Sequence, residues 1–150
     1  MSRLIRFGAG SISALGEVLG ELGVERALLV TTRRGAAAVP GLPVAGVYDG
    51  VLPHVPMETV EQAAARALEL GADGLVGLGG GAAIDACKAV VARLLESGLV
   101  FQEHKVVAVP TTYAGAEWTP YFGMRLAPGR KGGGMDERAT PVAALYDPEL

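Results

Sequence analysis

The sequence is poor in cysteine, in aromatic residues and in net charge, and each shortage excludes a class of protein. A single cysteine, Cys87, excludes an internal disulfide and a thiolate metal cluster. Three Phe, four Tyr, one Trp and a formal net charge of −3 provide neither the basic footprint nor the stacking residues of a nucleic-acid-binding protein. Nucleic acid is therefore not expected as a partner.

Long hydrophobic runs are also missing. Glycine, proline or a charge interrupts the apolar stretches every few residues, and residues 1–15 lack the basic start and apolar core of a signal peptide. We therefore expect a cytoplasmic protein without membrane contact. The 150 residues, of which 50% are hydrophobic and 19% charged, are typical of one globular domain with a substantial core.

Short apolar segments alternate with amphipathic ones along the chain. The apolar segments, which are typical of strands buried on both faces, are 27–31, 44–48, 75–78, 106–109 and 142–146. The amphipathic segments predict helices at 12–22, 58–70 and 82–96, with Gly23, Gly71 and Gly98 in the stopping positions. This order predicts an α/β fold with a mainly parallel, Rossmann-like sheet flanked by helices. A β-hairpin is predicted near the C-terminal end, from 121–126 and from 131 onward.

The most informative motif is a glycine turn between a predicted strand and a predicted helix. The strand at 75–78 runs into Gly79-Gly80-Gly81, and the helix that follows carries Ala82 and Asp85. Glycine permits close backbone approach, and a helix N-terminus offers free N–H groups to an anion. The turn therefore predicts a phosphate site, with a tightly packed strand-to-helix turn as the alternative. The dinucleotide fingerprint fits formally, but the acidic residue expected about 20 positions on is missing.

A second strand runs into a polar turn further along the chain. Residues 107–109 lead into Pro110-Thr111-Thr112 and then into Ala114-Gly115-Ala116-Glu117. In a parallel sheet both turns emerge at the carboxyl edge, where α/β folds bind ligands. The threonine hydroxyls can hydrogen-bond a ribose or a phosphate, with a helix N-cap as the alternative.

Together the motifs resemble a known family. The order Gly-Gly-Gly-x-x-x-Asp-x-x-Lys, Pro-Thr-Thr-x-Ala-Gly-x-Glu and Tyr-Asp-Pro-Glu-Leu is similar to the nucleotide-binding half of the iron-containing alcohol dehydrogenases. Within that family the sequence most resembles the maleylacetate reductases, through His54-Val55-Pro56 and Glu117-x-Thr119-Pro120. The resemblance implies that residues 1–150 form an NAD(P)-binding domain. It also implies that the family's C-terminal all-helical domain, which holds the substrate and an Fe or Zn ion, is absent from this chain.

The resemblance implies cofactor-binding roles for individual residues. Gly79, Gly80 and Gly81 would cradle the pyrophosphate of NAD or NADP, with Ala82 and Asp85 nearby. The sides of the cofactor would be lined by Thr111, Thr112, Ala116 and Thr119, and Lys131 in the hairpin would reach a ribose. The family commonly has Ser or Thr where this chain has Ala82 and Ala116, so two potential hydrogen-bond donors are missing. Alternatives are an Asp85–Lys88 pair on the helix surface and a solvated hairpin tip at Lys131.

The loop after the strand at 27–31 bears on the choice of cofactor. NAD-selective relatives place an Asp against the adenosine ribose, whereas this chain has Thr32 followed by Arg33 and Arg34. A guanidinium can pair bidentately with a 2′-phosphate, and no carboxylate repels it. We therefore expect NADPH to be accepted at least as well as NADH, with a solvated basic loop as the alternative.

The two histidines do not form a metal pair. His54 and His104 lack the i,i+4 spacing of a helical metal site, so no metal ligand is assigned in this chain. His54 is a candidate substrate-binding residue, and no catalytic residue is assigned.

The implied reaction is hydride transfer from a nicotinamide to maleylacetate in the degradation of aromatic compounds. The leading interpretation is the nucleotide-binding half of an NAD(P)H-dependent oxidoreductase, inactive without a C-terminal helical domain or a partner chain. We expect such a chain to form a homo- or hetero-oligomer. The alternatives are a non-catalytic nucleotide-binding or scaffold subunit, and a degenerate homologue that binds nothing.

Overall fold

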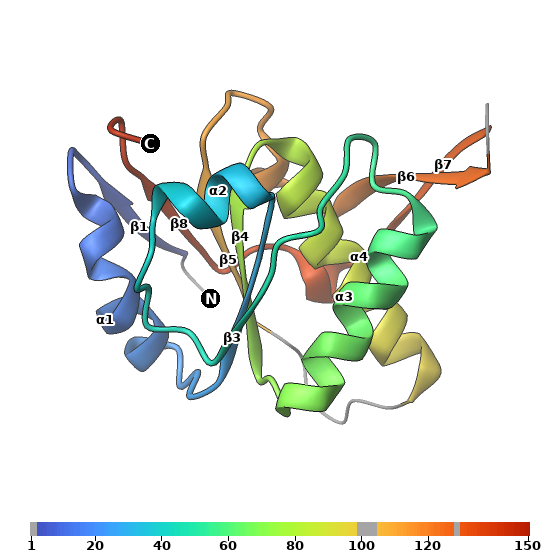
Figure 1. Ribbon diagram of the computed structural model, residues 1–150, viewed down its shortest axis with the longest axis horizontal. Helices are drawn as coiled ribbons and strands as arrows, with labels where there is room; N and C mark the ends of the chain where they lie inside the picture. The colour runs from blue at the N-terminus through green and yellow to red at the C-terminus, as the bar shows by residue number, and fades with distance from the viewer. Residues whose placement is uncertain (1–2, 99–104, 128–129) are drawn as a thin grey trace.

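The computed structural model describes residues 3–98, 105–127 and 130–150, and within these ranges it contains a six-stranded parallel sheet (Figure 1). His104 lies outside the described residues. The strands are β1 (Leu4–Phe7), β2 (Ala27–Thr31), β3 (Gly46–Tyr48), β4 (Gly74–Gly79), β5 (Lys105–Pro110) and β8 (Ala143–Tyr146). Their order across the sheet is β1-β8-β5-β4-β2-β3, and each neighbouring pair is parallel. The predicted α/β fold with a mainly parallel sheet is confirmed.

Helices cover both faces of the sheet. The helices are α1 (Leu15–Glu21), α2 (Arg33–Ala38), α3 (Met57–Leu70) and α4 (Gly81–Ser97), with 3-10 turns η1 (Ser11–Ala14), η2 (Ala116–Trp118) and η3 (Glu137–Ala139). Successive residues of a strand face opposite sides, so Leu28 packs with α3 and α4 while Leu29 packs with α1. Strands buried in this way on both faces explain the continuous apolar segments of the sequence.

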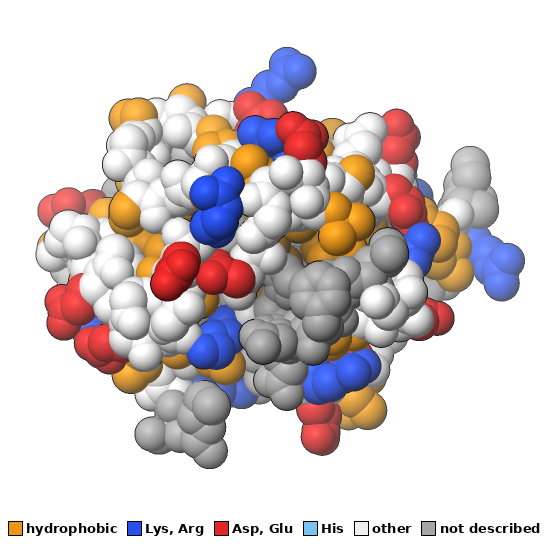
Figure 2. Space-filling view, turned by 90° about the horizontal axis from the view of Figure 1, so that it is seen from below, with side chains coloured by type: hydrophobic (Ala, Val, Ile, Leu, Met, Phe, Trp, Pro, Cys, Tyr) orange, Lys and Arg blue, Asp and Glu red, His pale blue; other side chains and the backbone are white. Residues whose placement is uncertain are grey.

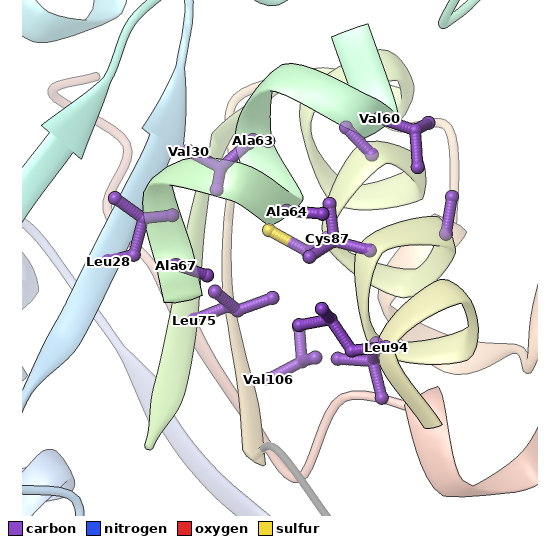
Figure 3. Packing of buried hydrophobic residues seen from close by; sticks show 14 of the residues in the cluster. Leu28, Val30, Val60, Ala63, Ala64, Ala67, Leu75, Cys87, Leu94 and Val106 are labelled. Carbon is purple, nitrogen blue, oxygen red and sulfur yellow. The ribbon is translucent and has the colours of Figure 1, made fainter. Parts of the chain in front are cut away.

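Cys87 lies in the core between α3, α4 and the sheet. Figure 3 shows its sulfur among Val30, Ala63 and Ala64, and the residue is fully buried. Burial raises the pKa of the Cys87 thiol. Because a thiolate is the reactive form of cysteine, the residue is structural here, as its apolar helix face indicates.

The predicted hairpin is present. Strands β6 (Tyr121–Ala127) and β7 (Arg130–Met135) form a separate antiparallel pair, and Pro128 and Gly129 of the expected turn lie outside the described residues. The partly buried Phe122 and Met124 of β6 pack against the core on the α3 and α4 side. The outer part of the hairpin extends away from the sheet (Figure 1).

Three elements differ from the sequence prediction. Strand β1 was not predicted, because Ile5 and Phe7 at this sheet edge are exposed and the segment is not continuously apolar. Helix α2 was not predicted, because none of its six residues is buried and no periodicity can arise. The helix expected at 12–22 is divided into η1 and α1, with Leu15 as the first α-helical residue.

Two neighbouring strands send the chain in opposite directions. Strand β2 leads outward to β3, whereas β4, which pairs with β2, leads the other way to β5 and then β8. Ligands of open α/β sheets bind outside the carboxyl ends of strands at such a switch point. Thr32 and the glycine turn lie at this position.

One face of the molecule carries side chains of mixed charge and polarity. Figure 2 shows one face of the molecule, on which acidic, basic and apolar side chains are interspersed. Such mixing of charges is not typical of a surface that follows a phosphate backbone. Among the described residues, no helix is both long enough and apolar enough to span a bilayer.

Candidate functional site

The glycine turn between β4 and α4 leaves little room for side chains. Gly79 has a φ of +144°, a conformation that L residues with a side chain rarely adopt. A Cβ on Gly80 would lie 3.2 Å from Thr112 Cγ2, and a Cβ on Gly81 would lie 3.3 Å from Ala114 Cβ. The backbone conformation requires the first glycine, and the close approach of the second turn favours the other two.

The N-terminus of α4 is free to meet an anion. Gly80 is the N-cap residue, and no side-chain oxygen of the described chain caps this helix. The N–H of Ile84 makes the first helical bond, to the carbonyl of Gly80 at 3.4 Å. The N–H groups of Gly81, Ala82 and Ala83 therefore remain available at the positive end of a 17-residue helix.

The second turn, which we define as residues 111–119, lies directly beside the glycine turn. The N–H of Thr111 donates to the carbonyl of Gly79 at 2.8 Å, and Gly79 is paired with Pro110 in the sheet. Thr111 and Thr112 are exposed. The structure thus brings Gly79, Gly80 and Gly81 together with Thr112 at the carboxyl edge.

A buried lysine ties the second turn to α4. Lys88 Nζ donates to the carbonyl oxygens of Ala116 at 2.7 Å and Thr119 at 3.1 Å, and lies 3.2 Å from Asp85 Oδ1. The other oxygen of Asp85 accepts from the N–H of Gly123 at 3.1 Å. The Asp85–Lys88 pair therefore forms, but it is not a surface pair, because the lysine side chain is 0% exposed.

The basic loop lies beside the glycine turn at the switch point. The hydroxyl of Thr32 accepts from the N–H of Gly35 at 3.0 Å and so caps α2. Thr31 Oγ1 donates to the carbonyl of Leu78 at 2.8 Å, which holds the end of β2 against β4. Arg33 and Arg34, in the first turn of α2, are exposed and so accessible to a ligand.

His54 lies in the loop between β3 and α3, and Lys131 lies in strand β7 of the hairpin. His54 and Val55 have positive φ values of 63° and 45°, and the carbonyl of Val55 accepts from the N–H of Arg125 at 3.0 Å. Such a backbone costs about 1–3 kcal/mol per residue and is found preferentially at functional sites. His54 is exposed, and Lys131 is exposed on the outward-extending hairpin, opposite Arg125 (Figure 1).

Sequence reasoning missed a hollow that the second turn itself lines, with the predicted site residues Thr111 and Thr112 in its wall. The aromatic hollow, as we call it, has a volume of about 540 Å³ and is lined by Phe7, residues 110–113, Gly115, Glu117, Trp118, residues 146–148 and Leu150. Tyr146 donates from its hydroxyl to Glu117 Oε2 at 2.8 Å. Burial and this hydrogen bond raise the pKa of Tyr146. The sequence signal is weak: Tyr113 and Trp118 follow strand β5, and Tyr146 is the last residue of β8.

Comparison with known proteins places this geometry in a family. Residues 2–148 match the family described as iron-containing alcohol dehydrogenase. The chain belongs to this family. The iron-containing alcohol dehydrogenases that it resembles include the maleylacetate reductase of Pseudomonas sp. strain P51, to which it is 40% identical over 153 aligned positions. That alignment covers 97% of this chain and 41% of the relative.

Solved structures of family members share the fold. The crystal structure of maleylacetate reductase from Agrobacterium tumefaciens superposes with a TM-score of 0.83 at 31% identity, covering 97% of this chain and 41% of that one. Sulfoacetaldehyde reductase from Bifidobacterium kashiwanohense, solved in complex with NAD+, has a TM-score of 0.83 at 21% identity, a likeness of fold alone. The chain thus spans about two fifths of the length of these proteins.

The family name implies iron, but the described part of this chain does not fit a metal ion. Across residues 3–98, 105–127 and 130–150, no three His, Cys, Asp or Glu side chains lie close enough together to hold one. A stable site needs about three or four protein ligands. No chemical step is therefore assigned to a metal held by these residues.

Proposed function

We propose that this chain is the NAD(P)-binding part of an NAD(P)H-dependent oxidoreductase similar to the maleylacetate reductases. The observation that carries the proposal is the glycine turn, where a Cβ on Gly80 or Gly81 would fill the space against the second turn. Beside this turn lies the uncapped N-terminus of α4. A backbone cradle at a helix N-terminus fits a pyrophosphate, and family membership supports the dinucleotide.

The proposed cofactor extends in both directions from the glycine turn. The N–H groups of Gly81 and Ala82 bind the pyrophosphate, and Thr112, whose side chain lies against Gly80, hydrogen-bonds its phosphate or ribose oxygens. The remaining cofactor-binding residues of the proposal are Thr32, Arg33, Asp85, Thr111, Ala116, Thr119 and Lys131. Asp85 acts through Lys88, which fixes the carbonyls of Ala116 and Thr119.

The proposed hydride transfer needs a second domain or a second chain. When bound, NAD(P)H supplies a hydride for a substrate of the maleylacetate type, and His54 is the proposed substrate contact. A hydride donor and its acceptor must be held close together, in the correct orientation, and shielded from water. The relatives extend well beyond the part that this chain spans, so we assign the shielding to a further domain or a partner chain, with an oligomer in the cytoplasm as the working form.

Calorimetric titration of the purified chain with NADPH tests the proposal. We expect saturable binding of one NADPH per chain. Gly80→Val is expected to weaken binding about tenfold or more, or ~1.4 kcal/mol, because its side chain would occupy the cradle near Thr112. Gly20→Ala is the matched control, because a Cβ on Gly20 in α1 meets nothing within 4 Å.

Two results would overturn the cofactor assignment. One is a folded chain that binds neither NADPH nor NADH, which would favour a degenerate homologue. The other is a Gly80→Val variant that binds like the wild type. A chain that binds the cofactor but gains no activity with any added partner would favour the non-catalytic subunit.

We propose further that NADPH is accepted at least as well as NADH, on the basis of the exposed Arg33 beside the switch point. A hydrogen bond to a charged group contributes about 1.5–3 kcal/mol, so Arg33→Gln is expected to weaken NADPH binding about tenfold or more and to leave NADH unchanged. Arg130→Gln, an exposed arginine of β7, is the control. NADH bound more than about tenfold more tightly than NADPH by the wild type would contradict the proposed acceptance of NADPH.

A further inference from the structure

We infer that Arg125 and Lys131, which face each other across the β6–β7 hairpin, bind a carboxylate group of the substrate. The substrate class is therefore an organic acid with two carboxylates, of which maleylacetate is an example. The inference rests on the proposed function and deepens it, because it adds Arg125 as a specificity-determining residue on the substrate side of the site.

The two cationic side chains lie next to each other. Arg125 in β6 stands directly opposite Lys131 in β7. The N–H of Arg125 donates away from β7, to the carbonyl of Val55 at 3.0 Å, so this is a non-hydrogen-bonded pair of the ladder, in which opposite side chains approach most closely. The Cβ atoms of such residues are about 4.5–5.5 Å apart. One carboxylate can therefore reach both cations.

The pair lies on the face of the hairpin that the core leaves uncovered. Phe122 and Met124 pack against the core, and successive residues of a strand alternate between its two faces. Arg125 therefore shares the other face with Gly123, and it is exposed. A Cβ on Gly123 would lie 3.9 Å from Asp85 Oδ2, so this face borders the N-terminal part of α4. The cations are thus accessible to a ligand beside the proposed cofactor site.

Neither cation has a carboxylate partner. Within residues 3–98, 105–127 and 130–150, the ion pairs engage other cations, namely Arg6, Arg66, Lys88, Arg93 and Arg138. Like charges directly opposite each other in a sheet repel, so the pair is unfavourable by itself. A bound anion removes this repulsion, and a guanidinium holds a carboxylate through two parallel N–H donors. The pair is therefore arranged as an anion site.

The position of the pair favours the substrate over the cofactor as the source of the anion. The proposed pyrophosphate already meets the free N–H groups of α4, and β6 contacts α4 at Gly123. Arg125 is two residues beyond that contact, about 7 Å further along the strand. The carbonyl that accepts from its N–H belongs to Val55, the neighbour of His54. A main-chain hydrogen bond thus joins Arg125 to the loop of the proposed substrate contact.

The proposed substrate needs cations that the rest of the site does not supply. Maleylacetate carries two carboxylates, and an anion is withdrawn from water only when charged or hydrogen-bonding partners replace the water. Arg3, Arg26 and Lys105 donate to main-chain carbonyls elsewhere in the described chain. Arg33 is proposed for the cofactor. Arg125 therefore fits the missing role, and the three donors of the Lys131 ammonium allow it to contact both a ribose and a carboxylate.

An NMR titration of the isolated chain with maleylacetate tests the inference. We expect the backbone amide signals of residues 54, 125 and 131 to shift and to saturate. Arg125→Gln is expected to weaken this binding about tenfold or more, because glutamine offers no charged hydrogen bond. The contact between Arg125 and Val55 is made by the main chain, so the substitution leaves it in place. Arg125→Lys, which keeps the charge but not the two-pronged donor, should bind with intermediate affinity.

Two controls separate charge recognition from a change in folding. Arg130→Gln replaces an exposed arginine of β7 whose side chain lies on the opposite face from Lys131, and it should bind maleylacetate like the wild type. The dimethyl ester of maleylacetate is uncharged. We expect it to bind the wild type about tenfold or more weakly than the free acid does, and to bind Arg125→Gln equally weakly.

Several outcomes overturn the inference. One is an Arg125→Gln variant that binds maleylacetate as tightly as the wild type does. Another is a dimethyl ester that binds the wild type as tightly as the dianion, a comparison that stands even if the variant does not fold. Absence of saturable shifts at residues 54, 125 and 131 in the wild type also refutes it. An Arg125→Gln variant that loses NADPH but not maleylacetate would assign the pair to a cofactor phosphate instead.

Failure of this inference can be told apart from failure of the proposed function. Gly80→Val should weaken NADPH binding and leave maleylacetate binding by the cofactor-free chain unchanged. Arg125→Gln should weaken maleylacetate binding and leave NADPH binding unchanged. A chain that binds maleylacetate through Arg125 but binds neither NADPH nor NADH would refute the cofactor assignment alone.

Discussion

Replacing Lys88 by methionine tests whether one buried ammonium group holds the second turn against α4. The lysine side chain is 0% exposed, and its Nζ lies within 3.2 Å of Asp85 Oδ1. The same nitrogen donates to the carbonyls of Ala116 and Thr119 at 2.7 and 3.1 Å. Methionine has a similar length but offers no hydrogen-bond donor. The Asp85 carboxylate and the two carbonyls would therefore all lose the Lys88 ammonium group as a partner.

The expected loss of stability follows from these contacts. Each hydrogen bond from a charged donor contributes about 1.5–3 kcal/mol, and breaking a buried ion pair by removing one partner costs about 3–5 kcal/mol. Two features reduce the loss, because Asp85 is 24% exposed and keeps the N–H of Gly123. We therefore expect the Lys88→Met substitution to lower the free energy of unfolding by about 3 kcal/mol, a large share of the roughly 5–15 kcal/mol of a typical domain.

Urea unfolding measures this loss with a built-in probe. Trp118 is the only tryptophan of the chain and lies in η2, whose first residue is Ala116, so its fluorescence reports on the second turn. Circular dichroism follows the helices in parallel. Lys131→Met is the control, because this exposed lysine should change stability by less than about 0.5 kcal/mol. A Lys88→Met variant as stable as this control would refute the reasoning.

Three further predictions concern packing and acid stability. Gly77→Ala should lower the free energy of unfolding, measured by urea titration, by about 1–3 kcal/mol. The reason is that its Cβ would lie 3.0 Å from Cys87 Sγ and 3.3 Å from the α4 backbone. Gly20→Ala, whose Cβ meets nothing within 4 Å, should not lower it. Cys87 should be unreactive toward Ellman's reagent in the native chain and should react once urea unfolds it, since burial raises its pKa; rapid native labelling would contradict this. The backbone N–H of residue 149, and then those of residues 12 and 10, hydrogen-bond Asp147 and lower its pKa from 3.8. The stability that ionised Asp147 contributes is therefore present above that pH and is lost as the pH falls through the folded pKa. Asp147→Asn should therefore flatten the decline of the urea midpoint below pH ~4.

The parallel sheet was predictable because its central strands are buried on both faces. Leu28, Leu75 and Val107 are each 0% exposed, and segments of this kind stand out in the sequence without any alignment. Strand β1 did not stand out, because its alternate residues are exposed at the edge of the sheet. Strand β1 pairs with β8 across more than 130 residues of sequence, and no local sequence pattern indicates a pairing over such a separation.

The cofactor-side motifs were predictable for a different reason. A glycine turn between strand and helix is a local feature, and the meeting of two such turns follows from the parallel topology. The environment of Lys88 was not predictable, because its partners Ala116 and Thr119 lie 28 and 31 residues away. The Oε1 of Glu117, unpaired within the described residues, was not predictable either, because a sequence alone gives no sign that a particular carboxylate is buried.

The second turn connects α4 with the aromatic hollow. Thr112 lies against Gly80 and also lines the hollow, Lys88 holds the carbonyls of Ala116 and Thr119, and Glu117 between them lines the hollow as well. The contacts of Lys88 therefore restrain the same short segment, residues 111–119, that borders the glycine turn. Because a segment that is already ordered loses less entropy when a ligand binds, this restraint favours binding at the proposed cofactor site.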